Sequence, residues 1–221
     1  MRNLNSAKMN SYEEAVKCIK HTYGGLNWPA LFARIRFFTA PYRQLVSFVP
    51  VQGLTIDLGC GYGIFSNLLG LLSPERKILG LDLDAYKIRY ANRGFANVEC
   101  RPGDITKLDL PPADAILLVH VLHHLNSYQE QEVLLQACFK KLKNGSKLII
   151  AEIDSHPTIK FLLARIADFV LYPGDKIYYR QPNDLRALLE QLDFKVEIKR
   201  WHAGTPFSHI GYICTKTTDS I

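Results

Sequence analysis

No apolar run in this chain of 221 residues approaches the roughly 20 residues that are needed to span a bilayer. The first five residues contain no apolar signal-peptide core, so we expect a cytoplasmic location. Cysteine pairs are missing as well, because the five cysteines lie far apart and form neither a CxxC motif nor a Cys/His cluster. This spacing argues against a zinc site, an iron–sulfur cluster or a disulfide framework.

Acidic residues are scarce at the start of the chain. Residues 1–50 contain seven Lys or Arg against Glu13 and Glu14, a balance of +5, whereas the whole chain carries +6. A basic segment of this kind is typical of a solvated helix face, of a contact with an acidic membrane surface, or of nucleic-acid binding. The sequence leaves these three interpretations open.

A glycine-rich turn stands out among the features that are present. The aliphatic segment 54–58 ends at Asp57 and Leu58, and Gly59, Gly61 and Gly63 follow at alternate positions. Glycines at such a strand-to-helix turn let the backbone approach a ligand closely, and the next helix points its positive end at the same place. The turn therefore predicts a site for a nucleotide-like cofactor. Cys60 in this turn is either a reactive thiol or a small residue that fits a tight turn, and we favour the second interpretation.

Behind this turn, short aliphatic segments alternate with amphipathic helical patterns, which indicates a parallel sheet covered on both faces. At 221 residues the chain is long enough for one domain. Gly145 is expected to close the helix before the fifth strand. The predicted strands are 54–58, 77–82, 97–101, 114–120 and 146–152, with helices at 64–72, 84–93 and 128–143, then a helix at 182–192 and a hairpin of strands 194–201 and 207–215.

Three helices are expected before the sheet. Ser11 and Glu14 resemble a capping box, Pro29 suits a first helical turn, and residues 42–49 form a further short helix. We divide the single domain into a helical cap (1–50), a ligand-binding core (51–153), a lid insertion (154–181) and a closing helix with hairpin (182–221).

Polar side chains lie where the predicted strands end, which is where an open α/β sheet binds its ligand. Asp82 ends the second strand, Asp104 follows the third, and His120 ends the fourth. A carboxylate at the end of the second strand can accept both hydroxyls of a ribose, and Ile105 can flank an adenine.

These segments together resemble the class I S-adenosylmethionine-dependent methyltransferases over roughly residues 40–215. The matching motifs are, in order, IDLGCGYG, LGLDLD, GDI, DAILLVHVLHHL and LKNGSKLIIAEI. The resemblance implies a doubly wound α/β fold with a seven-stranded, mostly parallel sheet in the order 3-2-1-4-5-7-6, an antiparallel last strand, and an N-terminal helical lid. It also implies S-adenosylmethionine as cofactor and S-adenosylhomocysteine as product.

Each motif implies a role for its residues in this chain. Asp57 would hold the methionine ammonium, with Gly59, Cys60 and Gly61 giving the backbone access to it. Asp82 would accept the ribose hydroxyls, and Leu83 would pack on the adenine. Asp104 would accept from the adenine amino group, and Ile105 would donate its backbone N–H to a ring nitrogen. His120 would lie near the methyl group, as the candidate general base or as a lining residue only.

Two rival sites can be compared with this one. A nicotinamide dinucleotide fold wants GxGxxG, but its third glycine position is Ile64 here, and a dinucleotide has no ammonium group for Asp57. Glu152, Asp154 and His156 follow the fifth strand and invite a magnesium site, but the full carboxylate set of a metal-dependent enzyme is missing. We therefore expect no metal.

The acceptor is expected to be a small, apolar or aromatic molecule or a lipid-like one, and O-methylation is favoured. We name His124, His156, Tyr179 and Arg180 as candidate substrate residues. Arg180 would contact the acceptor or would instead pair with Asp175 or Asp184. The basic N-terminus suits a peripheral membrane contact, and we expect no stable nucleic-acid complex. An enzyme acting on RNA or protein, and a non-enzymatic scaffold or activating subunit, are the alternatives.

Overall fold

The computed structural model describes residues 11–107, 109–156, 158–171 and 177–217. Seven strands form one sheet in the order β3-β2-β1-β4-β5-β7-β6, in which β7 runs antiparallel to both of its neighbours and the other pairings are parallel. This topology confirms the predicted fold. The strands are β1 (Gly53–Leu58), β2 (Arg76–Asp82), β3 (Val98–Pro102), β4 (Ala113–Val119), β5 (Leu142–Ile153), β6 (Phe194–Trp201) and β7 (His209–Lys216).

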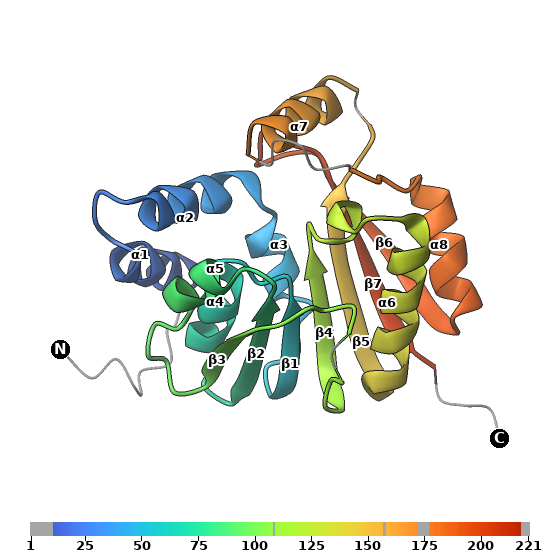
Figure 1. Cartoon of the computed structure of the whole chain (residues 1–221), viewed down its shortest axis with the longest axis horizontal. Coiled ribbons are helices and arrows are strands. Elements are labelled where there is room, and N and C mark those ends of the chain that lie inside the picture. The colour runs from blue at the N-terminus through green and yellow to red at the C-terminus, as the bar shows by residue number, and fades with distance from the viewer. Residues whose placement is uncertain (1–10, 108, 157, 172–176, 218–221) are drawn as a thin grey trace.

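Helices cover both faces of the sheet and give it two hydrophobic cores (Figure 1). On one face, α6 (Tyr128–Lys141) and α8 (Pro182–Gln191) bury Leu134, Leu135 and Leu189 against the strands. On the other face lie α4 (Ile64–Leu72) and the first helices of the chain, while α5 (Ala85–Ala91) packs beside β3. The strands are apolar on both sides because both sides are covered.

The predicted N-terminal helices are present as α1 (Tyr12–Thr22), α2 (Trp28–Thr39) and α3 (Tyr42–Val46). The Oγ of Ser11 accepts a hydrogen bond from the backbone N–H of Glu14 at 3.1 Å, which caps α1 as expected. The side chain of Tyr23 is 1% exposed, and its hydroxyl donates to the carbonyl of Tyr62 and accepts from Nδ2 of Asn67. The first helix is thus fixed to the core of the domain.

The structure corrects one helix boundary. α6 ends at Lys141, and β5 already begins at Leu142, which pairs with Ala113 of β4. Gly145 has a φ of 76° but lies inside β5, near a shift in the β4–β5 register, and does not close the helix. The predicted helix extends past the end of α6 because Leu142 continues the apolar pattern of the helix although it belongs to the strand. The hairpin of β6 and β7 is as predicted.

Two helices lie beyond the carboxyl edge of the sheet, α2 on one side and α7 (Thr158–Leu171) above it (Figure 1). They border the region into which the strands β1, β2 and β4 end. Over the ranges that the structure describes, no helix combines the length and apolarity needed to cross a membrane.

Candidate active site

A cavity of about 750 Å³ opens at the carboxyl ends of the strands, as expected for an open α/β sheet. Its volume falls within the usual range for small-molecule sites. One end is lined by the glycine turn after β1 and by the ends of β2 and β3, and the other end by α2, the β4 loop and Ala164 of α7. The cavity therefore joins the predicted strand-end positions Asp57, Asp82, Asp104 and His120, whereas Glu152, Asp154 and His156 lie outside its lining.

The three alternating glycines adopt left-handed backbone angles, with φ values of 72° at Gly59, 57° at Gly61 and 68° at Gly63. A Cβ at Gly59 would come within 2.6 Å of the side chain of Val121, and one at Gly63 within 2.8 Å of Ala91. A Cβ at Gly61, by contrast, would meet nothing within 4 Å. Protein packing explains the first and third glycines, whereas the bare backbone of Gly61 faces the cavity, where a ligand can lie against it.

Asp82 is held by two backbone groups at the end of β2. Its Oδ2 accepts from the N–H of Gly61 at 2.8 Å, and its Oδ1 accepts from the N–H of Asp84 at 2.9 Å. Each carboxylate oxygen has further lone pairs, and the residue lines the cavity. The next residue, Leu83, is 76% exposed on the cavity rim, so a flat apolar group bound there would cover it.

Asp57 is a buried carboxyl group that also lines the cavity. The hydroxyl of Ser66 donates to its Oδ2 at 2.5 Å. Burial raises the pKa of Asp57 to about 7, an effect that the Ser66 hydrogen bond opposes and the nearby Asp82 reinforces. A cationic group in the cavity would relieve this unfavourable burial of charge, so the site is suited to an ammonium.

Asp104 and Ile105 line the cavity after β3. The Asp104 carboxylate accepts from the N–H and hydroxyl of Thr106 at 3.0 and 2.6 Å and pairs with Lys107 at 2.9 Å. These hydrogen bonds, first of all that of the Thr106 hydroxyl, lower the pKa of Asp104 to about 2. Asp104 is therefore an ionised acceptor, and its Lys107 partner is an exposed side chain that a ligand can displace.

Cys60 also lines the cavity, and its Sγ contacts the carbonyl of Gly61 at 3.9 Å. Its sulfur and that of Cys100 both lie in the space that a side chain at Gly80 would fill. The neighbouring Cys100 and burial raise the pKa of the Cys60 thiol well above its ordinary value. The residue is a packed thiol of the turn, in keeping with its predicted role there.

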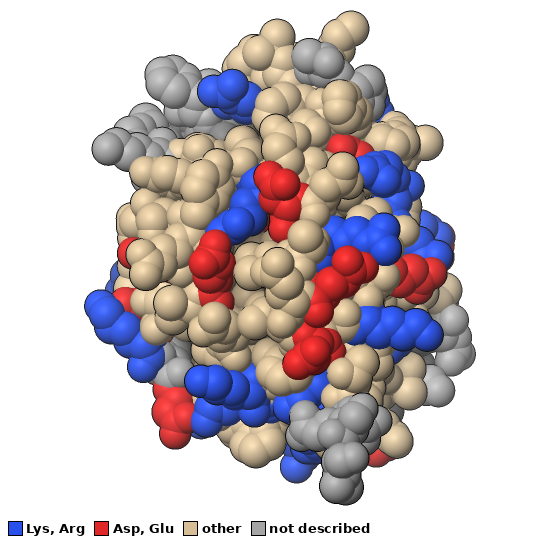
Figure 2. All heavy atoms as spheres, turned by 90° about the vertical axis from the view of Figure 1, so that its right-hand side faces the viewer, with Lys and Arg blue, Asp and Glu red and all other residues tan. Residues whose placement is uncertain are grey.

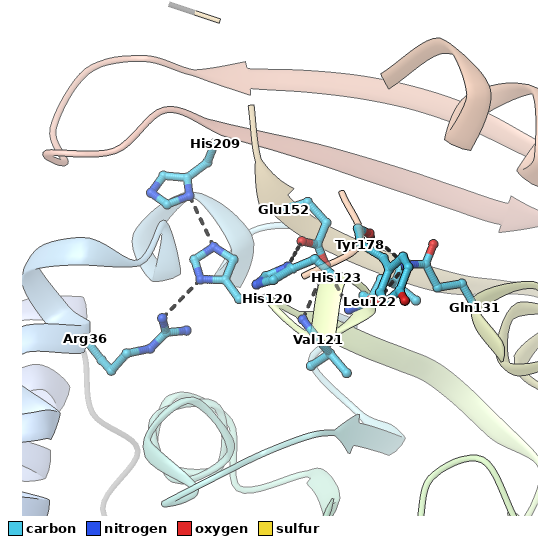
Figure 3. A network of polar contacts seen from close by, with 9 residues as sticks. All are labelled: Arg36, His120, Val121, Leu122, His123, Gln131, Glu152, Tyr178 and His209. Atoms are coloured by element: carbon cyan, nitrogen blue, oxygen red, sulfur yellow. Dashed lines mark hydrogen bonds and ion pairs between the residues drawn. The ribbon is translucent and has the colours of Figure 1, made fainter. Parts of the chain in front are cut away.

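His120 directly follows β4 and has a φ of 58°, a left-handed angle that is rare outside glycine. Figure 3 shows that both of its ring nitrogens are engaged: Nδ1 lies 3.0 Å from the Arg36 guanidinium and Nε2 lies 3.2 Å from Nδ1 of His209. Nε2 of His209 faces the carbonyl of Thr39 at 2.8 Å. Since that carbonyl can only accept, His209 donates from Nε2, His120 donates to His209, and Nδ1 of His120 accepts from Arg36.

Burial determines the charge of both rings in this hydrogen-bonded chain. Burial, with the Arg36 charge next, holds the pKa of His120 well below its ordinary value, and burial lowers the pKa of His209 to about 4. Both rings are neutral at pH 7, and the lone pair of His120 points at a guanidinium. The predicted role of His120 as a base requires Arg36 to move away.

His123 lies on the opposite side of the same loop, in the short helix η1 (Leu122–His124). Its ring is buried, and its Nδ1 contacts Oε2 of Glu152 (Figure 3). Oε1 of Glu152 accepts from the N–H of Leu122 at 3.0 Å and from that of Val121 at 3.3 Å. The carboxylate of β5 thus fixes both the loop backbone and the imidazole, and the imidazole lines the cavity.

The candidate substrate residues are divided among different places. His124 lines the cavity, whereas His156 is exposed and lies outside its lining. Tyr179 stacks on His123 with ring centres 4.9 Å apart and reaches the cavity only through that ring. Arg180 donates to Gln131 at 2.8 Å and to Glu132 at 2.7 Å, so it ties the chain to α6. The pairing predicted with Asp184 is replaced by this one, and Asp175 lies outside the described residues.

The carboxylates after β5 are occupied by the protein itself. Glu152 holds the β4 loop, and Asp154 accepts from Nε of Arg200 at 3.1 Å and from the N–H of His156 at 3.2 Å. In the part of the chain that the structure describes, no group of three or more His, Cys, Asp or Glu side chains is placed to hold a metal ion.

Arg36, His209 and the pair of His123 with Glu152 are the site residues that sequence reasoning did not assign. The signal for His123 and Glu152 was present, because each follows the end of a neighbouring parallel strand. Arg36 and His209 lie 84 and 89 positions from His120 in the sequence, and only the tertiary fold brings them together.

Comparison with known proteins gives the following similarities. Residues 56–150 match the family described as methyltransferase domain. The chain is 28% identical over 146 residues to a probable S-adenosylmethionine-dependent methyltransferase of Mycolicibacterium smegmatis, a match that covers 64% of this chain and 52% of that protein. It is 28% identical over 124 residues to indole glucosinolate O-methyltransferase 5 of Arabidopsis thaliana, covering 56% of this chain and 33% of that protein.

Among solved structures, the magnesium protoporphyrin IX methyltransferase of Synechocystis PCC 6803, crystallised with bound SAH, superposes with a TM-score of 0.66 at 16% identity. The superposition covers 94% of this chain and 96% of that one. At this identity the likeness concerns the fold. The chain spans about half the length of the first curated relative above and one third of the second.

Proposed function

Because this chain belongs to the class I S-adenosylmethionine-dependent methyltransferases, we propose that it transfers a methyl group from S-adenosylmethionine to an oxygen atom of a small apolar or aromatic acceptor. One observation carries the proposal: a single cavity joins the Gly61–Asp82 end, suited to an adenosine, to a buried histidine held by a carboxylate, suited to accepting a proton.

The residues present fit this cofactor by their chemistry. Asp82 offers carboxylate lone pairs for two hydroxyls, Leu83 and Ile105 offer apolar surface for an adenine, and Asp104 offers an ionised acceptor for an amino group. Asp57 gains an ammonium partner that stabilises its charge. The open space at Gly61 lets the ligand lie against bare backbone.

S-Adenosylmethionine supplies a methyl group on a positively charged sulfur, so attack by an acceptor atom transfers the methyl group and leaves S-adenosylhomocysteine. The protein's own contribution is to align the acceptor and to remove its proton. We assign the proton transfer to His123: Glu152 fixes the imidazole through Nδ1 and stabilises the positive charge that forms when Nε2 takes the proton. His120, with Nδ1 accepting from Arg36, is assigned as a lining and positioning residue.

The lining of the acceptor end favours an apolar or aromatic molecule. Phe32 and Ile35 of α2, Ile153 at the end of β5, and Phe207 of the β6–β7 connection contribute to it. Apolar walls with a few polar groups are typical of small-molecule sites. The name of the Arabidopsis relative, an O-methyltransferase, agrees with oxygen as the acceptor atom. The cytoplasm remains our proposed location.

The experiment has two stages. Titration calorimetry with S-adenosylhomocysteine should give a measurable heat with the wild type, and Asp82→Ala should weaken binding by roughly 100-fold, since two charge-assisted hydrogen bonds contribute about 1.5–3 kcal/mol each. A screen of phenols, alcohols and amines with labelled methyl donor then identifies the acceptor. Tight binding of a nicotinamide dinucleotide, together with no binding heat from S-adenosylmethionine or S-adenosylhomocysteine, would overturn the assignment. If the methyl label appeared only in RNA or protein, the acceptor would be that macromolecule and not a small molecule.

A further inference from the structure

Exposed apolar side chains gather on two segments of the described structure. Of the thirteen large hydrophobic residues that are exposed among the described residues, eight lie in or next to α2 and α7. We call these eight the apolar rim: Leu26, Trp28, Leu31, Phe38, Ile159, Leu162, Leu163 and Ile166. Isolated apolar side chains on a surface are ordinary, but a group of this size on two helices that both line the cavity marks an interaction surface.

The α7 part of the apolar rim has the periodicity of a buried helix face. Ile159, Leu162, Leu163 and Ile166 follow the i, i+3, i+4, i+7 pattern that normally faces a core, and their exposed fractions run from 48% to 77%. The same helix buries Ala164 against the cavity, and Phe161 contacts the ring of Tyr179. The helix therefore has a second apolar face that points away from the domain.

The charges beside the apolar rim are mostly basic. Segments 26–40 and 155–171 contain four basic residues and one acidic residue, Asp168. Arg34 and Arg165 are exposed, Lys160 donates to backbone carbonyls of the β6–β7 connection, and Arg36 turns inward to His120. On the side that carries α6 and α8, acidic and basic side chains are instead interspersed (Figure 2).

The apolar rim also has a defined position relative to the cavity. Phe32 and Ile35 of α2 and Ala164 of α7 line the acceptor end of the cavity, while the exposed faces of the same two helices carry the apolar rim. Both helices lie beyond the carboxyl edge of the sheet (Figure 1). A surface that covers the apolar rim would lie next to the acceptor end of the cavity.

We propose that the apolar rim binds the surface of an anionic lipid bilayer. Helices that present Trp, Phe and Leu with Lys or Arg beside them lie in the membrane interface, where apolar burial and attraction to anionic lipid add. Each basic residue near such a surface contributes about 1 kcal/mol. A second copy of this chain fits less well, because two such surfaces facing each other would bring together an excess of basic over acidic residues.

This inference also narrows the chemical class of the acceptor molecule, a step that rests on the proposed function. A cavity whose acceptor end lies beside a membrane-bound surface suits an amphipathic acceptor that partitions into lipid and enters between α2 and α7. The acceptor class is then a lipid-like molecule with a polar hydroxyl.

The test is sedimentation of the full chain with vesicles of phosphatidylcholine alone and of phosphatidylcholine with phosphatidylserine. The double variant L162E/I166E removes two apolar-rim side chains, and the matched control V51E/V133E makes the same changes at exposed aliphatic positions outside it. The wild type and the control should bind the anionic vesicles, more weakly at high salt. The L162E/I166E variant should bind at least about tenfold more weakly, since the lost apolar and electrostatic terms exceed 1.4 kcal/mol.

Equal binding by both double variants would overturn the proposal, as would the absence of wild-type binding to anionic vesicles. A dimer in light scattering that L162E/I166E dissociates, without any vesicle binding, would assign the apolar rim to self-association. Calorimetry with S-adenosylhomocysteine on the same variant keeps the two proposals apart, because membrane binding does not require the cofactor site and the cofactor site does not require the apolar rim.

Discussion

The Arg36 guanidinium lies 3.0 Å from Nδ1 of His120 and joins helix α2 to the end of strand β4. The contact places a positive charge against a strained, partly buried imidazole and fixes its tautomer. It also forms part of the cavity wall, so the first helices of the chain and the sheet build the acceptor end together.

This contact predicts the protonation state of His120. At pH 7 the ring should be neutral with its proton on Nε2, and it should stay neutral down to pH 6, because burial and the Arg36 charge both disfavour the imidazolium. Nitrogen chemical shifts of the histidine rings in NMR spectra measure this directly. In Arg36→Ala the pKa should rise toward its ordinary value. A protonated His120 in the wild type at pH 6 would contradict the assigned hydrogen-bond directions.

Cofactor affinity should depend on pH through Asp57. Its pKa is raised to about 7 in the free protein, and an ammonium partner favours the ionised form, so binding should weaken as the pH falls below 7. Between pH 7.5 and 5.5 the Kd for S-adenosylhomocysteine should rise roughly tenfold. Calorimetry over this range measures the effect. Asp57→Asn should bind weakly at every pH, and a wild-type affinity independent of pH would contradict the role of Asp57.

The same raised pKa has an opposite consequence for the stability of the free protein. A carboxyl group whose pKa is higher in the folded state than the ordinary 3.8 stabilises the fold fully below that lower value and loses this contribution as the pH rises through about 7. Asp57→Asn should therefore raise the melting temperature of the cofactor-free protein at pH 8 and change it little at pH 4. Thermal unfolding at the two pH values is the measurement.

Gly61→Ala should separate cofactor binding from folding. The left-handed φ of 57° makes alanine unfavourable by about 1–2 kcal/mol, but no protein atom lies within 4 Å of the added methyl group. The variant should fold with a modest loss of stability, yet bind S-adenosylhomocysteine at least about tenfold more weakly, since the methyl group fills ligand space.

Gly94→Ala is the matched control, because Gly94 has a φ of 80°, an equally open Cβ position and no place in the cavity lining. It should lose similar stability and keep its affinity. Gly63→Ala, with Ala91 in the way, should lose more stability than either. Equal affinities of the Gly61 and Gly94 variants would show that the ligand does not lie against Gly61.

The two histidines of the β4 loop should differ in their effect on turnover. His123→Ala should lower kcat by about 100-fold or more, the usual contribution of a general base, and leave the Kd for S-adenosylhomocysteine near the wild-type value. His120→Asn keeps a side chain that tolerates the left-handed backbone angle, and should lower kcat much less. Single-turnover rates with an identified acceptor measure the effect of each substitution. A larger loss of rate in His120→Asn than in His123→Ala would identify His120 as the base.

The sheet and the cofactor end could be predicted from the sequence because their signals are local. A glycine directly follows β1, and β2 ends at a carboxylate. Parallel strands bring such ends to one edge of the sheet, whatever the details of packing. Asp57, Asp82 and Asp104 therefore line one cavity as expected.

The acceptor end could not be predicted in the same way. Which of His120, His123 and His124 contacts a carboxylate depends on the left-handed turn at His120 and on the β4–β5 register that places Val119 beside Ala151. The boundary at Leu142 was missed for a related reason, since a leucine suits both a helix face and a strand. Arg36 and His209 reach His120 because helix α2 and the β6–β7 hairpin pack against the domain. The sequence pattern does not predict how closely these elements pack.

The docking of Tyr23 on Asn67 and on the carbonyl of Tyr62 bears on how this chain is made. Helix α1 leaves the ribosome before α4, and at about 5–20 residues per second its partner follows roughly 2–9 s later. Until then Ala15, Ile19 and Tyr23, all buried in the finished domain, stay exposed to water. During this interval the nascent protein offers an apolar segment to chaperones, and its N-terminal helix is secured only when translation has passed the glycine turn.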